Sequence, residues 1–442
     1  MEKTKKYLKL QKRKILIFTY YWPPSGGSGV QRWLYFSKFL KDLGWDPIVI
    51  TVKKSKASYS VFDNSLESYV NNLIVHRTDT LEPLKFYSKI FYGNSKEGIQ
   101  KGEVVKKNFF HHFAAFIRGN FFIPDARKGW VRYALKKGRE LIKKEHINYV
   151  VTTGPPHSSH LIGLRLKKEF SVKWIADFRD PWTSMFYIKE MYRTRFAQKR
   201  DENFEKNVLT KADKIITTIG DLFHDELIQK ANISQKKLFA IPNGYDSDLI
   251  NNVSQKFNST FHIVYSGLLT NNHSFKPFFL ILKDLKSLYP KLKLKVSLAG
   301  QISEDVDLFI RENSNKIKYE NNGYLPHFKS IKLIKKANLL LNFTYNSSSN
   351  DKMIPGKILE YIATGIPILS IGNTNNYLSR FLLKGTCAKT FSNNDLKEMK
   401  FFIQKIIDSF IKNKPLSNSF PDIENYSRMV LTKKLSNIIS KK

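Results

Sequence analysis

The sequence predicts an α/β protein built from two Rossmann-like domains in tandem. Short apolar runs, typical of buried parallel strands, alternate with segments of helical periodicity along most of the chain. The 442 residues are too many for one hydrophobic core and suit two domains. A polar, turn-rich stretch that begins at Pro242 separates two such series, so it is the candidate linker.

The first series opens with a β-loop-α-β unit. An apolar run at residues 14–19 precedes a glycine-rich loop, after which apolar residues recur at helical spacing until Gly44. We expect further strands at residues 47–52, 147–152, 173–178, 214–218 and 238–241, and helices at 158–170 and 184–209. The aromatic and basic segment 109–125 fits either buried helices or a surface that meets a membrane or lipid acceptor, and both interpretations stay open.

The second series repeats this alternation. We expect strands at residues 262–266, 293–298, 338–343 and 366–371, and helices at 277–288, 328–336, 394–411 and 426–440. The N-terminal domain then spans residues 1–248 and the C-terminal domain spans 249–415. The helix within residues 416–442 is expected to pack back on the N-terminal domain.

The net charge of +36 calls for an anionic partner or a bias in composition. Anionic membrane surfaces fit it, whereas nucleic acid is not expected because no zinc-finger spacing, basic leucine zipper or RNA-recognition motif is present. One cysteine, Cys387, excludes a disulfide framework and indicates a reducing compartment. No apolar run approaches the ~20 residues of a membrane span. We therefore expect a cytoplasmic protein, soluble or peripheral on the inner face of the plasma membrane.

The segment from Lys352 to Glu360 carries the strongest chemical signal. A loop ending in Pro355 and Gly356 leads into a short amphipathic helix, whose free N–H groups and partial positive charge suit a diphosphate. Lys357 and Lys352 would add cationic charge, and Glu360 could accept two ribose hydroxyls. The plainer alternative is an ordinary strand–loop–helix–strand unit with a solvent-facing glutamate.

Three further segments leave the ends of strands, where ligands of such sheets bind. The loop S-G-G-S-G-V-Q-R contains Gly27, Gly29 and Arg32 and allows close backbone approach to a ligand, or is simply a tight turn. His157, in T-T-G-P-P-H-S-S-H, is a candidate for contact with a sugar or an acceptor. In W-I-A-D-F-R-D-P-W an aspartate could orient an acceptor hydroxyl, or Asp–Arg pairing could brace the loop.

These segments together resemble the retaining GT-B glycosyltransferases of family 4, of a bacterial polysaccharide type. The resemblance runs from residue 14 to about residue 371 and includes I-P-N-G at residues 241–244 and P-G-K-x-x-E-Y at residues 355–361. It implies two Rossmann-like domains facing across a cleft. The C-terminal domain would bind a nucleotide-sugar, the N-terminal domain the acceptor, and G-Y-L-P-H at residues 323–327 would pack near the nucleobase. Transfer would proceed with retention and without a metal or other cofactor.

The expected roles follow from these motifs. We expect donor binding by Gly27, Gly29, Gly267, Lys276, Lys352, Gly356, Lys357 and Glu360, acceptor binding by Arg32 and Arg179, and catalytic roles for His157 and Asp180. Two positions depart from the family pattern. Lys352 stands where a glutamate is usual, and Leu268 replaces an arginine in the phosphate-binding turn.

The function expected is therefore nucleotide-sugar-dependent transfer to a sugar or lipid-linked acceptor, for a surface polysaccharide. Three alternatives remain. One is an epimerase or phosphorylase of the same fold, and another is a polyanion- or nucleic-acid-binding α/β protein. The third is a catalytically inactive paralogue, which the residues at positions 352 and 268 would explain.

Overall fold

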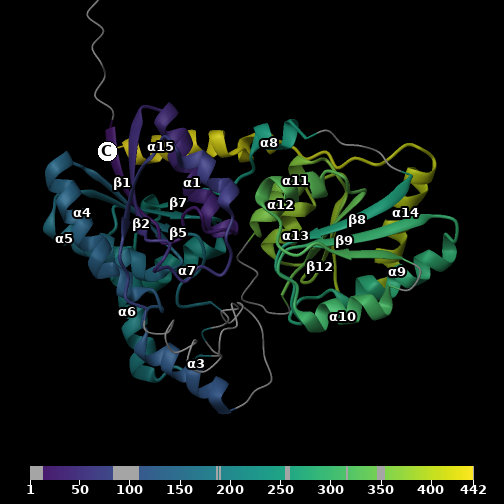
Figure 1. The fold of residues 1–442 in the computed structure, drawn as a ribbon, viewed down its shortest axis with the longest axis horizontal. Helices are drawn as coiled ribbons and strands as arrows, with labels where there is room; N and C mark the ends of the chain where they lie inside the picture. The colour runs from purple at the N-terminus through teal and green to yellow at the C-terminus, as the bar shows by residue number, and fades with distance from the viewer. Residues whose placement is uncertain are drawn as a thin grey trace, which may run out of the picture.

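The computed structural model describes residues 13–82, 109–185, 188, 191–253, 259–314, 317–345 and 354–441. They form two domains side by side, each with a parallel sheet between helical layers (Figure 1). The prediction of two Rossmann-like α/β domains is confirmed. Lys352 lies outside the described residues.

The N-terminal sheet has the strand order β3-β2-β1-β4-β5-β6-β7, and every pair is parallel. Its strands are β1 (Arg13–Phe18), β2 (Trp45–Val52), β3 (Ile74–Thr78), β4 (Tyr149–Gly154), β5 (Lys173–Phe178), β6 (Lys214–Thr217) and β7 (Leu238–Ala240). Side chains alternate between two cores, so Ile15 and Ile17 face one helical layer while Leu16 and Phe18 face the other.

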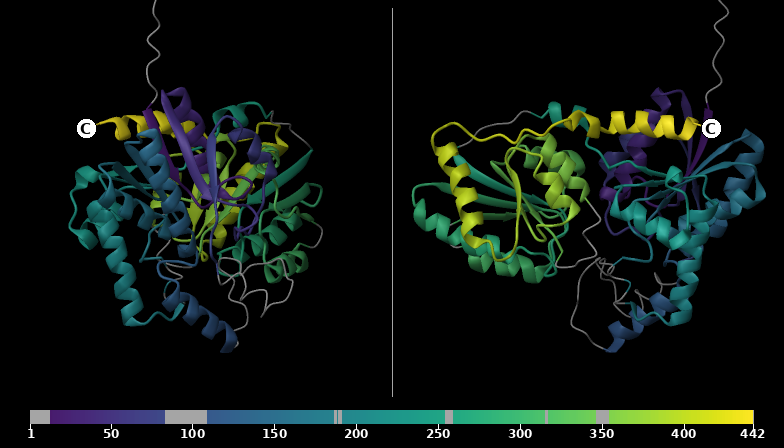
Figure 2. Two further views of the ribbon diagram at one scale, coloured as in Figure 1. Left: turned by 60° about the vertical axis from the view of Figure 1, so that its left-hand side comes forward. Right: turned by 180° about the vertical axis from the view of Figure 1, so that it is seen from behind.

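The helices of this domain cover both faces. They are α1 (Ser28–Asp42), α4 (Val131–Glu145), α5 (His160–Glu169), α6 (Arg195–Lys211) and α7 (Leu222–Ala231). Helix α3 (Phe109–Phe121) lies away from the sheet, against α6 (Figure 1). Helix α1 shares its face of the sheet with α15 (Arg428–Ser440), the last helix of the chain, which returns from the C-terminal domain (Figure 2). Leu431 and Leu435 of α15 are buried in that core.

The C-terminal sheet repeats the pattern with the order β10-β9-β8-β11-β12-β13. Its strands are β8 (Thr260–Ser266), β9 (Lys293–Ala299), β10 (Lys318–Asn321), β11 (Leu339–Phe343), β12 (Ile368–Ile371) and β13 (Ala388–Phe391). Helices α9 (Lys276–Leu288), α10 (Glu304–Asn313) and α14 (Leu396–Ile411) cover one face. Helices α8 (Ser247–Asn251), α11 (His327–Ile334), α12 (Gly356–Ala363) and α13 (Tyr377–Leu382) cover the other.

Two expectations need correction. The helix expected from residue 184 begins only at Arg195, because Thr194 caps α6 by accepting a hydrogen bond from the backbone N–H of Ala197 at 3.2 Å. The turn-rich linker expected from Pro242 contains a short helix, because Asp246 caps α8 by accepting a hydrogen bond from the backbone N–H of Leu249 at 3.1 Å. For segment 109–125, for which the sequence leaves two interpretations open, the structure shows exposed side chains at Phe113, Phe116 and Phe121 of α3.

Candidate functional site

The first turn of α12 places Lys357 beside the carboxyl ends of β8 and β9. Its ammonium nitrogen lies 3.7 Å from the ring centre of Tyr265, and a Cβ built on Gly267 would lie 3.5 Å from that nitrogen. Among the described residues no carboxylate pairs with Lys357. Burial lowers the pKa of this lysine well below its ordinary value. An anion that approached the ammonium would relieve that penalty.

Two glycines keep the backbone beside Lys357 free of side chains. Gly267 and Gly300 both have positive φ, at 136° and 130°. A Cβ on Gly300 would lie 2.0 Å from the carbonyl oxygen of Gly267, so no other residue fits there without moving the turn. The N–H groups of both glycines are already paired, with the carbonyls of Ala299 and Gly323, so these residues supply space beside Lys357 and not donors. The donors that suit a phosphate are the ammonium of Lys357 and the N–H groups at the start of α12, which begins at Gly356.

Glu360 lies one turn farther along α12, and only 15% of its side chain is exposed. His327 Nε2 lies 2.7 Å from Glu360 Oε1, and Arg428 Nη2 lies 3.3 Å from the same oxygen. Burial opposes ionisation of Glu360, but His327 and Arg428 outweigh it and lower the pKa of this carboxyl below its ordinary value. The carboxylate does not point into bulk solvent, and within the described residues its second oxygen has no protein partner.

The residues around Glu360 join the two domains, and we call this region the interdomain junction. The hydroxyl of Tyr324, before α11, accepts a hydrogen bond from the Gly27 N–H at 3.2 Å. The His327 N–H donates to Asp63 of the N-terminal domain at 3.1 Å. Arg428 Nη2 also donates to Gln31 of α1 at 2.5 Å. The glycine-rich loop thus lies against the domain that carries Lys357 and Glu360.

The acceptor-side candidates cluster at the carboxyl ends of β4 and β5. His157 is buried and stacks on Trp182 with ring centres 4.9 Å apart and planes 9° apart. His160 stacks on Phe178 in the same way, and burial lowers its pKa to about 3. Asp180 is half-buried and makes no side-chain hydrogen bond or ion pair to any described residue.

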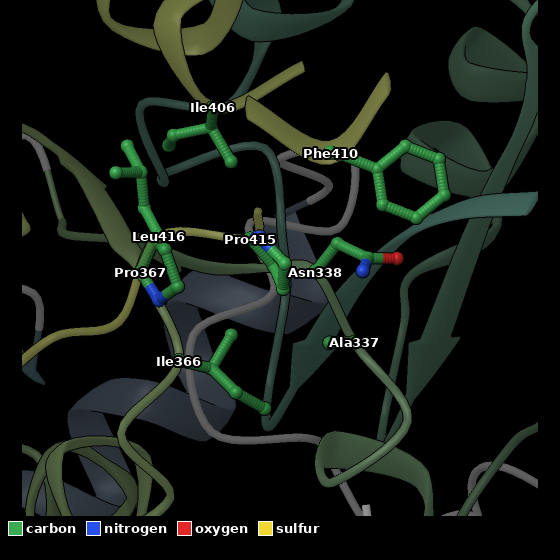
Figure 3. A pocket seen from close by; sticks show the side chains of 8 residues that line it. All are labelled: Ala337, Asn338, Ile366, Pro367, Ile406, Phe410, Pro415 and Leu416. Atoms are coloured by element: carbon green, nitrogen blue, oxygen red, sulfur yellow. The ribbon is translucent and has the colours of Figure 1, made fainter. Parts of the chain in front are cut away.

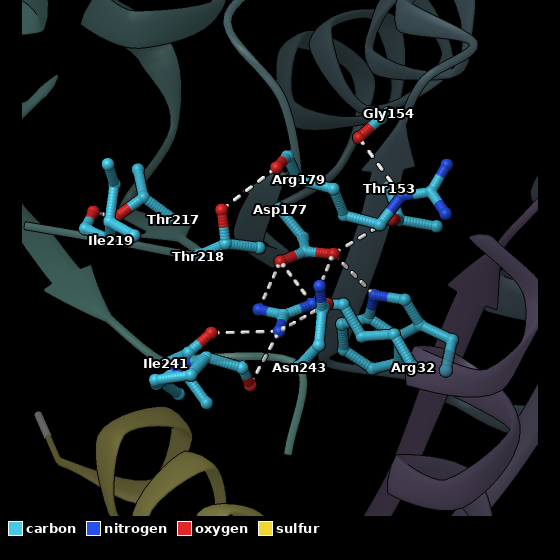
Figure 4. Close-up of polar contacts among 12 residues, drawn as sticks. Arg32, Thr153, Gly154, Asp177, Arg179, Thr217, Thr218, Ile219, Ile241 and Asn243 are labelled. Atoms are coloured by element: carbon cyan, nitrogen blue, oxygen red, sulfur yellow. Dashed lines mark hydrogen bonds and ion pairs between the residues drawn. The ribbon is translucent and has the colours of Figure 1, made fainter. Parts of the chain in front are cut away.

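Two predicted acceptor ligands are occupied by the protein itself (Figure 4). Neither Arg32 nor Asp177 has exposed side-chain surface, and they form an ion pair at 2.9 Å. Arg32 also donates to the backbone carbonyls of Ile241 and Pro242.

Arg179 also uses its side-chain donors within the protein. Its guanidinium donates to the carbonyls of Gly154, Gly29 and Pro155 and so fixes the glycine-rich loop to the end of β4. The Asp–Arg ion pair that was expected to brace the loop forms between Asp177 and Arg32, which lie far apart in the sequence.

The structure does not bring every predicted donor residue to this place. Lys276 is exposed at the start of α9, with its ammonium 5.5 Å from the ring centre of Phe309 on α10. A small pocket in the C-terminal domain, lined by Asn338 and Pro367 among others, opens at the amino ends of β11 and β12, the opposite edge of that sheet (Figure 3). It is therefore separate from the Lys357 and Glu360 region.

Sequence reasoning missed two charged groups that contact Glu360 or its neighbours. Arg428 belongs to the terminal helix, which was expected on the N-terminal domain but not beside Glu360. Asp63 precedes a short 3-10 helix in a stretch without a clear pattern. His327 and Tyr324 carried a signal, since both belong to the G-Y-L-P-H segment.

Within the described residues, no group of three or more histidine, cysteine or acidic side chains is arranged to hold a metal ion. No helix in the described part of the chain is both long and apolar enough to cross a membrane.

Two doubly wound parallel-sheet domains bridged by a returning C-terminal helix constitute the GT-B fold, and solved structures of that fold resemble the chain. A glycosyltransferase from Rickettsia africae is 14% identical, with 97% of this chain and 98% of that one covered and a TM-score of 0.58. Anabaena Alr3699/HepE, solved with UDP and glucose, is 12% identical over 97% and 100%, with a TM-score of 0.59. A putative UDP-N-acetylglucosamine 2-epimerase from Listeria monocytogenes is 10% identical over 97% and 96%, with a TM-score of 0.52.

No protein-family model matches the chain, and no curated protein matches its sequence. At such identities the likeness establishes the fold, and the same fold serves both transferases and an epimerase. The reaction must therefore be argued from the residues of the site.

Proposed function

We propose that the protein is a glycosyltransferase that moves a sugar from a nucleoside diphosphate sugar to an acceptor. The observation that carries the proposal is the pair on α12. Lys357 offers an ammonium without a carboxylate partner among the described residues, and Glu360 offers an ionised carboxylate one turn away. A diphosphate linked to a ribose carries the complementary groups, an anion and two adjacent hydroxyls.

The chemistry of transfer suits this arrangement. As the bond between the sugar and the diphosphate breaks, negative charge develops on the leaving phosphate oxygen. The N–H groups at the start of α12 and the ammonium of Lys357 would stabilise that charge without a metal. Glu360 would hold the ribose and so fix the diphosphate against the helix. The solved structure of Alr3699/HepE with UDP and glucose belongs to a protein of the same fold, which supports a nucleotide-sugar as donor.

The finer features of the reaction come from the motifs. Retention of anomeric configuration is proposed on the resemblance to family 4. Asp180, half-buried at the end of β5, is proposed to orient the acceptor hydroxyl or take its proton late in transfer. His157 is proposed to contact the sugar or the acceptor.

A lipid-linked acceptor is proposed because α3 and α6 of the N-terminal domain expose aromatic side chains. Phe113, Phe116 and Phe121 of α3 are 49%, 37% and 65% exposed, and Phe196 of α6 is 77% exposed. Aromatic side chains that stand out among lysines and arginines are typical of contact with an anionic membrane. Binding to vesicles that contain anionic lipid, lost when Phe121 and Phe196 are both changed to serine, would support it. Equal binding by that variant would rule this surface out.

The donor assignment is tested by calorimetric titration with UDP, GDP, ADP and CDP. At least one should bind, and Glu360→Gln, which is nearly isosteric, should weaken that binding by at least about tenfold, because a neutral amide replaces a charged acceptor. Circular dichroism should show the variant folded. Binding of none of the four, or equal binding by the variant, would refute the assignment.

An epimerase is the second candidate, because a putative one shares the fold. The two reactions differ in their products. A transferase releases free nucleoside diphosphate in proportion to the sugar transferred, whereas an epimerase that leaves the sugar on its nucleotide does not. A chain that binds the nucleotide but turns over no sugar with any acceptor would be the inactive paralogue.

A further inference from the structure

Arg428 lies where four segments meet: α1, α12, the chain before α8 and the start of α15. Only 4% of its side chain is exposed. Its guanidinium carbon lies 4.0 Å from the ring centre of Tyr35, and a Cβ on Gly244 would lie 3.1 Å from the Arg428 side chain. The guanidinium is therefore held in a defined place by aromatic and backbone neighbours from the N-terminal half of the molecule.

The hydrogen bonds of Arg428 are distributed unevenly. Nη2 serves both Gln31 Oε1, at 2.5 Å, and Glu360 Oε1, at 3.3 Å. Nε and Nη1 are buried and have no partner among the described residues. Leaving buried N–H groups unpaired costs stability. The position of Arg428 is therefore not explained by a contribution to stability alone.

The bonds to Glu360 are also one-sided. Both His327 and Arg428 donate to Oε1, and Oε2 is left without a protein donor within the described residues. A carboxylate held by one oxygen presents the other at a fixed angle to a ligand hydroxyl. One of these two donors, Arg428, belongs to α15, which packs on α1 of the N-terminal domain.

We propose that Arg428 is a positioning residue for the donor: it orients Glu360 toward the ribose from across the domain boundary, so the donor site is complete only while α15 stays docked on α1. This inference rests on the proposed function. Nucleotide binding and the docking of the terminal helix then strengthen each other. Gln31, within the glycine-rich segment and the start of α1, ties that segment to the same guanidinium.

The charged and titratable groups that face Glu360 are His327 from α11, Arg428 from α15 and Tyr361 on its own helix. Removing Arg428 removes one of the two hydrogen-bond donors, His327 and Arg428, that favour the ionised form of Glu360. The carboxyl would then take up a proton at a higher pH, and ribose binding would weaken first on the acidic side.

The test compares Arg428→Met with Lys434→Met, a control on α15. Lys434 donates to the Ala240 carbonyl of the N-terminal domain at 3.1 Å and does not contact Glu360. Each variant is titrated with the tightest-binding nucleoside diphosphate of the panel above and, separately, with inorganic pyrophosphate, which has no ribose. The titrations are run at about pH 7.5 and at the lowest pH at which both variants stay folded, because a less stabilised carboxyl takes up its proton at a higher pH.

Arg428→Met should bind the nucleotide at least about tenfold more weakly at the higher pH and still more weakly at the lower one, with pyrophosphate affinity unchanged. Lys434→Met should change neither affinity. A parallel loss of pyrophosphate and nucleotide binding would mean general damage to the site and would overturn the proposal, as would nucleotide binding equal to that of Lys434→Met.

The two proposals fail separately. If Glu360→Gln weakens nucleotide binding but Arg428→Met does not, only the role of Arg428 falls. If the unaltered protein binds no nucleoside diphosphate, both fall. Should Arg428→Met not fold, Gln31→Ala, which removes one tie of the guanidinium, is expected to weaken nucleotide but not pyrophosphate binding, and an unchanged ratio would count against the proposal.

Discussion

Arg32 and Asp177 form an ion pair at 2.9 Å that neither side chain exposes to solvent. Arg32, the last residue of the glycine-rich segment, belongs to α1, and Asp177 belongs to β5. The carboxylate also accepts hydrogen bonds from Trp33 Nε1 at 2.6 Å and Thr153 Oγ1 at 2.8 Å. The pair thereby fixes α1 and its preceding loop to the centre of the sheet.

Removal of Arg32 should destabilise the fold strongly. Arg32→Met leaves the buried carboxylate without its cation, which typically costs about 3–5 kcal/mol of unfolding free energy. The double variant Arg32→Met/Asp177→Leu should recover part of that loss, because no unpaired charge is then buried. Urea denaturation measures both.

Lys14→Met is the matched control for this experiment. Its partner is Glu145, and both side chains of that pair are about a third exposed, at 36% and 31%. We expect no resolvable change in the urea midpoint. If Arg32→Met had the same urea midpoint as Lys14→Met, the buried pair would not stabilise the fold.

The central strands of both sheets could be predicted because they are buried on two faces and read as continuous apolar runs. Strands β3, β10 and β13 were not predicted, and all three lie at sheet edges. An edge strand such as K-Y-E-N of β10 has few apolar residues, since one side of it meets solvent. Its position depends on the neighbouring strand rather than on its own pattern.

The candidate site divides in the same way. Lys357 and Glu360 lie in one continuous motif and could be found from it. Arg428 is 68 residues from Glu360 along the chain and reaches it only because α15 returns to α1. Arg32 was expected to face a ligand, and the sequence could not reveal that the end of β5 would enclose it.

Acid should weaken the fold through buried neutral histidines. Burial lowers the pKa of His160 to about 3 and the pKa values of His262 and His273 to about 4. The unfolded chain binds these protons near pH 6.5 and the folded chain does not, so stability falls as the pH drops from about 6.5 toward 4, by about 1.4 kcal/mol per pH unit for each histidine.

His262→Gln should make this fall shallower. The variant removes one titrating ring, whose Nε2 lies 2.8 Å from Ser297 Oγ. Urea midpoints between about pH 7 and about pH 4.5 give the slope. The exposed His146, changed to asparagine to suit its φ of 51°, is the control. Identical slopes for the His262 variant and the unaltered protein would contradict the prediction.

Gly300→Ala should abolish nucleotide binding by steric overlap. The added methyl group would lie 2.0 Å from the Gly267 carbonyl oxygen, so the turn beside Lys357 must move. Gly365→Ala is the control, because Gly365 also has positive φ, at 70°, and a Cβ there meets nothing within 4 Å. It should cost about 1 kcal/mol in stability and leave binding intact. Equal binding by the two variants would place the nucleotide elsewhere.

Binding of the diphosphate should be accompanied by proton uptake at Lys357. Burial holds the pKa of this ammonium well below its ordinary value, and a neighbouring anion favours the charged form and raises the pKa again. The affinity should then fall as the pH rises through the pKa of the free site, because above that pKa the amine must take up a proton when the diphosphate binds. Calorimetry at several pH values between about 7 and about 9.5, each in two buffers of different ionisation enthalpy, counts the protons. Lys357→Met should abolish the difference between buffers, whereas Lys276→Met, a change to an exposed lysine stacked on α10, should preserve it. Binding heats that are independent of the buffer in the unaltered protein would mean that the ammonium of Lys357 is not the group that meets the diphosphate.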